Sequence, residues 1–199
     1  MDLRSAIGAP SYNCGMKFAT VVGSLIILIG TAAAQRPNPT QAGKLATGFT
    51  LSSPSFGSGA SIPEAFTCSG QDVSPVLSWT GEPAQTASFA LIADDPDAPA
   101  GTWVHWVMWN IPHQSHLLTR NITKSGTLPD GSMQGKNDFD KVGYNGPCPP
   151  PGKTHRYYFR LYALDTKLTL QPGATRKELD AAMKGHILAK GEHMGAYKR

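Results

Sequence analysis

Short apolar or alternating runs, separated by Pro and Gly clusters, occupy the chain from about residue 49 to residue 170. The clearest runs cover residues 76–79, 88–93, 103–111 and 156–164. Runs of this length at close spacing predict antiparallel strands. Parallel strands need longer, usually helical, crossovers, and no helix-length pattern alternates with these runs. The pattern therefore favours a mainly β fold.

One helical pattern follows near the C-terminus. Thr175 and Glu178 have the spacing of a capping box. Residues with apolar side chains then recur at helical spacing from Leu179 to Ile187, with His186 on the same stripe. The sequence predicts one amphipathic helix packed on the β core. Residues 191–199 are expected to form a short basic tail that either folds back over a sheet edge or frays.

The first 34 residues have the pattern of a secretory signal peptide. Lys17 precedes an apolar run over residues 18–30, and three alanines at 32–34 are the small residues that a signal peptidase accepts. The run is shorter than the roughly 20 residues of a transmembrane helix. We therefore predict a signal peptide over residues 1–34, with Met16 as an alternative start, and an exported, periplasmic or secreted protein without a transmembrane span after cleavage. An uncleaved N-terminal anchor is the alternative interpretation.

Composition is consistent with one globular domain. Of the 199 residues, 40% are hydrophobic and only 16% are charged, which excludes an intrinsically disordered chain. The formal net charge is +4 and no dense Lys/Arg run is present, so a nucleic-acid partner is not expected. We predict a flexible leader over residues 35–48 and a single domain over residues 49–199.

Cleavage of the predicted signal would remove Cys14 and leave Cys68 and Cys148 as the remaining cysteines. An even pair in an oxidising compartment favours a disulfide. That bridge would close a loop of about 80 residues. Two free, buried thiols are the alternative.

Three segments place ionisable groups where strands meet Pro-rich loops. They are the acidic turn over residues 94–99, the aromatic run over residues 103–109, and the loop over residues 143–154 that leads into His155 and Tyr157. Three carboxylates within the acidic turn repel one another unless a cation, backbone N–H groups or a positive histidine offset them. Each segment taken alone also has an ordinary structural explanation: a surface turn, a core histidine and a Pro-rich connection.

The alternation of side chains along a strand predicts which residues share a face of the sheet. It places His105 on the same face as Trp103, Val107 and Trp109. It also places His155 and Tyr157 on one face of the last predicted strand.

Common catalytic motifs, such as G-x-S-x-G, H-E-x-x-H, C-x-x-C and the phosphate-binding loop, do not occur in the sequence. We therefore expect no catalytic residues, no metal site and no cofactor.

Together the three segments resemble the phosphatidylethanolamine-binding protein family, and in particular its shorter bacterial branch of Raf-kinase-inhibitor-like proteins. The resemblance runs over residues 49–199 and is carried by Asp-Pro-Asp-Ala-Pro at 95–99, Trp-Val-His-Trp-Val at 103–107 and Gly-Pro-Cys-Pro-Pro-Pro-Gly at 146–152. It implies a Greek-key antiparallel β-sheet sandwich with a small anion pocket at one end of the sheet. The implied polar residues of that pocket are Asp95, His105, His155 and Tyr157. The implied walls are Ala98, Trp103, Gly146, Pro149 and Pro150.

The expected function is non-enzymatic binding of a small anionic, phosphoryl-bearing ligand such as phosphate or phosphorylethanolamine. Imidazolium and phenolic O–H groups donate hydrogen bonds to such anions. Asp95 would accept a proton from His105 or His155 and raise the pKa of that histidine. One alternative is an exported inhibitor or interaction protein acting on a protease or another envelope protein. A second is a weak hydrolase that uses Asp95 with His105 or His155 as base and acid.

Overall fold

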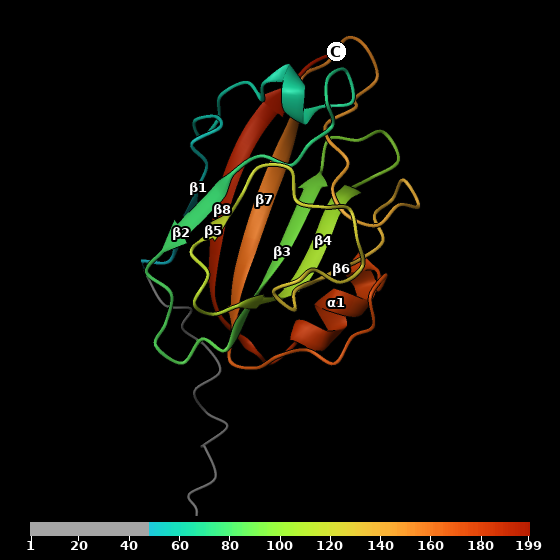
Figure 1. Ribbon diagram of the computed structural model, residues 1–199. Coiled ribbons are helices and arrows are strands. Elements are labelled where there is room, and N and C mark those ends of the chain that lie inside the picture. The colour runs from blue at the N-terminus through green and yellow to red at the C-terminus, as the bar shows by residue number, and fades with distance from the viewer. Residues whose placement is uncertain (1–47) are drawn as a thin grey trace, which may run out of the picture. The chain divides into compact units, whose positions relative to one another are not determined.

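The computed structural model describes residues 48–199 (Figure 1). The predicted signal peptide over residues 1–34, with Cys14, and residues 35–47 of the predicted leader lie outside this range. No helix within the described range is long and apolar enough to cross a membrane.

Residues 48–199 form eight strands in two sheets, together with one α-helix and one short 3-10 helix, and all pairings between these strands are antiparallel. The five-stranded sheet, in the order β6-β4-β3-β7-β8, contains β3 (Ser88–Asp95), β4 (Trp103–Pro112), β6 (Met133–Gln134), β7 (His155–Leu164) and β8 (Ile187–Tyr197). The three-stranded sheet, in the order β1-β2-β5, contains β1 (Thr50–Ser52), β2 (Leu77–Thr80) and β5 (Leu117–Leu118). The helices are η2 (Glu64–Phe66) and α1 (Arg176–Met183). The predicted mainly β fold with one α-helix is confirmed.

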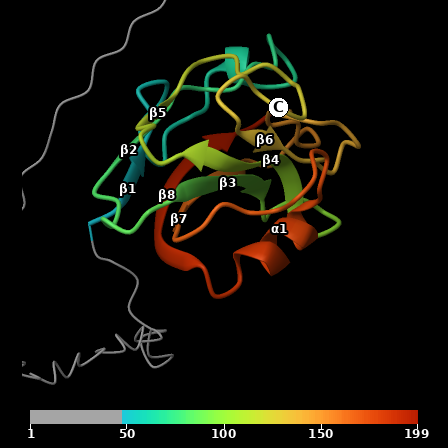
Figure 2. The same cartoon turned by 60° about the horizontal axis from the view of Figure 1, so that its bottom comes forward.

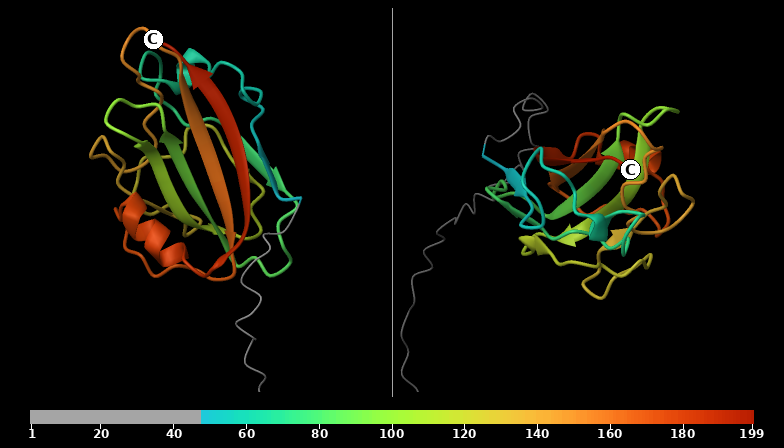
Figure 3. Two further views of the ribbon diagram at one scale, coloured as in Figure 1. Left: turned by 180° about the vertical axis from the view of Figure 1, so that it is seen from behind. Right: turned by 90° about the horizontal axis from the view of Figure 1, so that it is seen from above.

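The larger sheet is covered on both faces, as Figures 2 and 3 show. On one face the smaller sheet packs against it through an aromatic cluster, in which the Phe89 ring lies 5.9 Å from that of Phe49 and 5.3 Å from that of Trp79. On the other face Leu179 and Met183 of α1 contribute to a second apolar core. Because both faces are buried, every residue of β3 is buried, and the strand is a near-continuous apolar run in the sequence.

The C-terminal helix begins as predicted but ends earlier. The Thr175–Glu178 capping box is present. The helix stops at Met183, because Gly185 adopts a positive φ of 85° that ends helices. The extension of the helix to Ile187 is therefore wrong. His186 is not in the core either: it is exposed, and its Nδ1 lies 2.8 Å from Asp165 Oδ1.

Of the two alternatives for the basic tail, fraying is wrong for residues 191–197, because they run along the edge of the larger sheet and belong to β8. This strand pairs with β7 from Ile187 to Tyr197 and forms one edge of the larger sheet. Its inward-facing positions are Ala189, Gly191, His193 and Gly195. Three of these four side chains are very small and the fourth is polar, so the strand carries no alternation of large apolar residues that the sequence could reveal.

A β-bulge changes the face of His105. Ala93 pairs with Trp106 and Asp94 pairs with Val104, so His105 is the extra residue of β4. A bulge adds one residue and reverses the alternation beyond it. Val107 and Trp109 consequently pack in the core beneath α1, whereas His105 faces the opposite side with Trp103. The prediction that His105 shares a face with Val107 and Trp109 is therefore wrong.

Candidate functional site

A cavity of about 340 Å³ lies where the end of β3 meets the starts of β4 and β7. Its wall consists of Asp95, Ala98, Pro99, Ala100, Trp103, His105, Phe139, Cys148, Pro149, Pro150 and His155. Seven of the nine residues implied by the resemblance are in this wall, and Tyr157 and Gly146 are not. Three distant segments of the chain therefore meet in one cavity, which we call the anion pocket.

Asp95 and His155 form the buried polar centre of the anion pocket. His155 Nδ1 lies 2.7 Å from Asp95 Oδ2, and both side chains are almost fully buried. The backbone N–H of Asp97 donates to the other carboxylate oxygen, at 2.8 Å. An ionised Asp95 only accepts hydrogen bonds, so His155 donates through Nδ1 and its Nε2 remains for a ligand. Of the two histidines considered as partners of Asp95, the structure selects His155.

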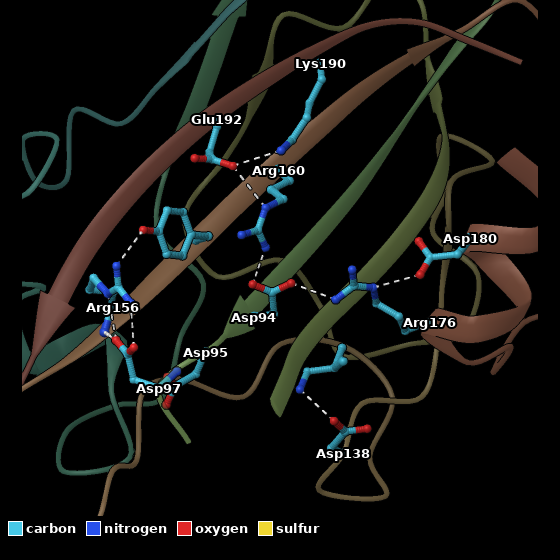
Figure 4. Close-up of polar contacts among 12 residues, drawn as sticks. Asp94, Asp95, Asp97, Asp138, Arg156, Arg160, Arg176, Asp180, Lys190 and Glu192 are labelled. Atoms are coloured by element: carbon cyan, nitrogen blue, oxygen red, sulfur yellow. Dashed lines mark hydrogen bonds and ion pairs between the residues drawn. The ribbon is translucent and has the colours of Figure 1, made fainter. Parts of the chain in front are cut away.

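A second acidic contact holds the same turn from outside. The Asp97 carboxylate accepts hydrogen bonds from the Arg156 guanidinium at 2.6 and 2.9 Å and from the Arg156 backbone N–H at 2.9 Å (Figure 4). The hydrogen bonds from this guanidinium lower the pKa of Asp97 to about 2. Asp95 and Asp97 thus tie the turn after β3 to His155 and Arg156, the first two residues of β7.

His105 is held by the Pro-rich loop rather than by a carboxylate. Its Nδ1 lies 2.7 Å from the carbonyl oxygen of Asn145, and the Asn145 N–H donates to the His105 carbonyl at 3.0 Å. A carbonyl oxygen only accepts, so Nδ1 carries the proton. Burial lowers the pKa of His105 below its ordinary value of 6.5. The expectation of a raised histidine pKa is therefore wrong for His105, because desolvation outweighs the nearby charge of Asp95.

Tyr157 lies behind His105 rather than in the wall. The two rings meet edge to face at 5.2 Å. Within the described residues the Tyr157 hydroxyl is buried and makes no hydrogen bond. Burial, reinforced by the Asp95 carboxylate, raises its pKa well above 10. Its hydroxyl therefore stays protonated at physiological pH as an unused donor next to the pocket.

Gly146 has a structural position in the loop before β7. Its backbone N–H donates to Asp72 Oδ1 at 2.6 Å, and the other oxygen of that carboxylate accepts from Asn145 Nδ2 and from Lys124 Nζ. A Cβ at Gly146 would lie 2.1 Å from the Phe66 carbonyl oxygen. Gly146 lines a smaller neighbouring cavity, which shares Phe139 and Cys148 with the anion pocket. Its close packing holds the loop that carries Asn145.

The same loop is cross-linked. Cys68 and Cys148 form a disulfide with an S–S distance of 2.07 Å and a sequence separation of 80 residues. The predicted pairing is present, and the alternative of two free thiols is wrong. Cys148 belongs to the wall of the anion pocket, so the bridge ties that wall to the segment after η2.

Three further contributors to the site are not among the residues that the sequence nominates, although Asn145 lies within the Pro-rich segment. Phe139 lies just before the loop over residues 143–154 and outside all three segments, and its ring meets those of Trp103 and His105 edge to face at 5.5 and 5.2 Å. Asn145 orients His105, and Asp72 orients Asn145. An isolated phenylalanine, asparagine or aspartate in a polar loop is common, so only its position in the fold identifies it. Within residues 48–199 no cluster of three or more His, Cys, Asp or Glu is placed to hold a metal ion.

The chain is similar to known proteins over most of its length. The family model described as phosphatidylethanolamine-binding protein matches residues 52–198. A UPF0098 protein of Methanothermobacter thermautotrophicus is 51% identical over 149 residues, which cover 75% of this chain and 98% of that protein. A UPF0098 protein of Aquifex aeolicus is 48% identical over 147 residues, covering 73% of this chain and 85% of that protein.

Two solved structures share the fold. The crystal structure of a putative phosphatidylethanolamine-binding protein homologue from Chlamydia trachomatis has a TM-score of 0.71 at 36% identity, covering 77% of this chain and 99% of that one. E. coli YbcL, described as a member of the mammalian PEBP family, has a TM-score of 0.72 at 34% identity, covering 76% and 98%. The matched range includes all three segments that build the anion pocket, and the chain belongs to the phosphatidylethanolamine-binding protein family.

Proposed function

We propose that the protein binds a small, phosphoryl-bearing anion in the anion pocket, without turning it over. The observation that carries this proposal is the convergence of two buried imidazoles, His105 and His155, on one cavity whose carboxylate already accepts hydrogen bonds from the protein. Both oxygens of Asp95 accept hydrogen bonds from the protein itself. The carboxylate thus orients His155, and both of its oxygens are hydrogen-bonded within the protein.

His105 links anion binding to proton uptake. Its Nδ1–H donates to the Asn145 carbonyl, so the neutral ring has only a lone pair at Nε2. That lone pair repels an anion, whereas protonation creates both a donor and a positive charge. Because burial lowers the pKa of His105, most of the molecules carry a neutral ring near pH 7. An anion favours the protonated ring, and its affinity should therefore rise as pH falls from about 8 to about 6.

The remaining wall supports a ligand larger than a bare ion. The volume of about 340 Å³ lies at the lower end of the range for small-molecule sites. Trp103, Phe139, Pro149 and Pro150 provide apolar surface around the two imidazoles. A phosphomonoester with a short organic group suits this combination. The family description names phosphatidylethanolamine, whose head group is phosphorylethanolamine, and this supports the same ligand class.

Calorimetric titration with phosphorylethanolamine tests the proposal. The titration compares the wild type with His105→Ala and His155→Ala at pH 6 and pH 8. Sulfate serves as a second probe because its charge does not change over this range. We expect tighter binding at pH 6 for both anions, and a loss of about tenfold or more in each variant. His116→Ala, which removes an exposed histidine, is the matched control. Affinity independent of pH and unchanged in both pocket variants would overturn the proposal.

Two parallel assays test the alternative functions, a weak hydrolase and an inhibitor. If the protein hydrolyses phosphate or carboxylate esters and His155→Ala abolishes this activity, the hydrolase would be favoured over the binding protein. If the protein binds a protease stoichiometrically and has no affinity for phosphorylethanolamine, the inhibitor would be favoured over the binding protein. Cys148, which is in the pocket wall, is oxidised in the disulfide, so its sulfur is not a free nucleophile. This supports ligand binding over covalent catalysis.

The proposal includes export. Disulfides persist in oxidising compartments, and the Cys68–Cys148 bridge supports the location expected from the N-terminal pattern. Mass spectrometry of protein recovered from cell fractions tests it. We expect a chain beginning at Gln35 outside the cytoplasm, with a mass lower by two hydrogens than that of the reduced form. A full-length, reduced chain in the cytoplasm would contradict export and leave the ligand proposal intact.

A further inference from the structure

A second, more open cavity of about 510 Å³ lies on the opposite face of the larger sheet, between the turn after β3, strand β7 and the start of α1. Its wall consists of Asp94, Pro96, Thr102, Val104, Arg160, Arg176, Lys177 and Asp180. It shares no wall residue with the anion pocket. We call it the outer groove.

Two guanidinium groups meet on one buried carboxylate at this groove. The Asp94 side chain is 2% exposed and lies between Arg160 and Arg176, as Figure 4 shows. Arg160 Nη1 donates to Asp94 Oδ1, and Arg176 Nη1 donates to Oδ2 at 2.7 Å. One negative charge therefore faces two positive charges, and the carboxylate is fully satisfied.

Both guanidinium groups are also fixed from their other side. Arg160 Nε donates to Glu192 at 3.0 Å, and Arg176 Nε donates to Asp180 at 3.1 Å. The Nη2 atom of each arginine makes no hydrogen bond to another residue of the described part of the chain. The arginines are 18% and 30% exposed and belong to the groove wall. Each guanidinium group is thus held in place, and its Nη2 N–H groups remain available as donors next to an open cavity.

Lys177 adds a third positive charge to the wall. It forms no ion pair within residues 48–199 and is exposed beside Arg176. The wall therefore carries three cations against the carboxylates of Asp94 and Asp180. Glu192, which binds Arg160 from outside the wall, is itself paired with Lys190, so an excess of one positive charge remains. Pre-organised guanidinium groups with a net positive charge favour an oxyanion, because the cost of ordering the arginines has already been met in the fold.

We propose that the outer groove is a second ligand site, which binds a small oxyanion through the Nη2 groups of Arg160 and Arg176 and the ammonium group of Lys177. The ligand class is a phosphoryl or carboxylate group on a small molecule. The proposal of this second site is independent of the proposed function of the anion pocket, since the two sites have different wall residues on opposite faces of the sheet.

Titration of ¹⁵N-labelled full-length mature protein with inorganic phosphate, followed by NMR, tests this site. The amide signals of Thr102, Val104 and Lys177 report on the outer groove, and those of His155 and Tyr157 report on the anion pocket. We expect both sets to shift. Lys177→Gln should weaken binding at the outer reporters several-fold, and Arg176→Gln by about tenfold or more, with the inner reporters unchanged. A parallel titration with succinate distinguishes carboxylate from phosphoryl ligands.

Matched variants complete the experiment. Lys184→Gln, which removes an exposed lysine just after α1, should leave the outer reporters as in the wild type. Arg176→Lys keeps the charge but lacks the fork, and should bind with intermediate affinity. Because Lys177 makes no ion pair, its variant keeps the test valid even if Arg176→Gln loses stability. The second site would be overturned if the outer reporters did not shift with either probe, or if they shifted in Lys177→Gln and Arg176→Gln as they do in the wild type. Shifts of the inner reporters alone would overturn it too, while leaving the anion pocket intact.

Discussion

Asp94 and Asp95 are adjacent in the sequence, yet they bind partners on opposite faces of the five-stranded sheet. Asp95 accepts from His155 in the anion pocket, and Asp94 accepts from two arginines in the outer groove. Successive side chains of a strand point to opposite faces, so the last two residues of β3 reach both sides. The turn over residues 96–102 is consequently anchored from both faces of the sheet.

Removing the Asp95 carboxylate should destabilise the protein. Asp95→Ala leaves the His155 Nδ1–H and the Asp97 N–H without their acceptor, at a cost of about 1–3 kcal/mol. Urea denaturation of Asp95→Ala, His155→Ala and the double variant measures this cost and the coupling between the two side chains. We expect the double variant to be less destabilised than the sum of the single variants. Additive effects would show that the contact contributes nothing.

Acid stability should depend on Asp97. Its pKa is about 2 in the folded protein and has a reference value of 3.8, so its contribution is complete above pH 3.8 and is lost as pH falls through 2. Asp97→Asn should therefore lose less stability than the wild type between about pH 4 and pH 2. Denaturation curves across this window measure the slope. Arg156→Gln removes the cause of the shift and should flatten the same slope, whereas a wild-type slope in both variants would contradict the assignment.

The Cys68–Cys148 bridge should contribute substantially to stability. It closes a loop of 80 residues, and cross-links of this kind contribute about 2–4 kcal/mol. We expect the free energy of unfolding of a double Cys68→Ser, Cys148→Ser variant to be lower by about that amount, which urea denaturation would show as a lower midpoint. Reductant should destabilise the wild type similarly and have no further effect on the double variant. Equal stability of all three forms would show that the bridge does not constrain the fold.

Gly146, in the loop before β7, is tightly packed, and Gly57 is a matched control position with more space around it. A Cβ at Gly146 would lie 2.1 Å from the Phe66 carbonyl oxygen, whereas at Gly57 the nearest heavy atom is the Ala60 Cβ at 3.8 Å. Gly146→Ala should therefore cost about 1–3 kcal/mol or more, because backbone must move. Gly57→Ala should be within about 0.5 kcal/mol of the wild type. Thermal denaturation of both variants tests the close approach, and similar melting temperatures would contradict it.

Local pattern identified the parts of this protein in which large apolar side chains define a face. The runs at 88–93, 103–111 and 156–164 correspond to β3, β4 and β7, since each strand buries bulky residues at regular intervals. The capping box was visible because it involves neighbouring residues only. By contrast, β8 was not visible, because Gly191 and Gly195 provide space on its inner face where other strands have a large side chain.

The candidate site followed a similar division. Three motifs were enough to nominate its main residues by resemblance, including Asp95, His105 and His155. Residue chemistry could not decide which histidine pairs with Asp95, because that depends on the register of β3 against β7 and on the bulge at His105. The places of Gly146 and Tyr157 behind the wall, and of Phe139 within it, also depend on segments that meet only in the folded chain.

The amino-acid order was therefore sufficient for the fold class, the principal strands and the chemistry available near the Pro-rich turns. Folding decided which of those groups meet, how deeply each is buried and where the cations collect. The physical reason is one of range: side-chain periodicity and capping act over a few residues. Desolvation of His105, pairing of Asp95 with His155 and the double clamp on Asp94 act between segments separated by 40 to 82 positions.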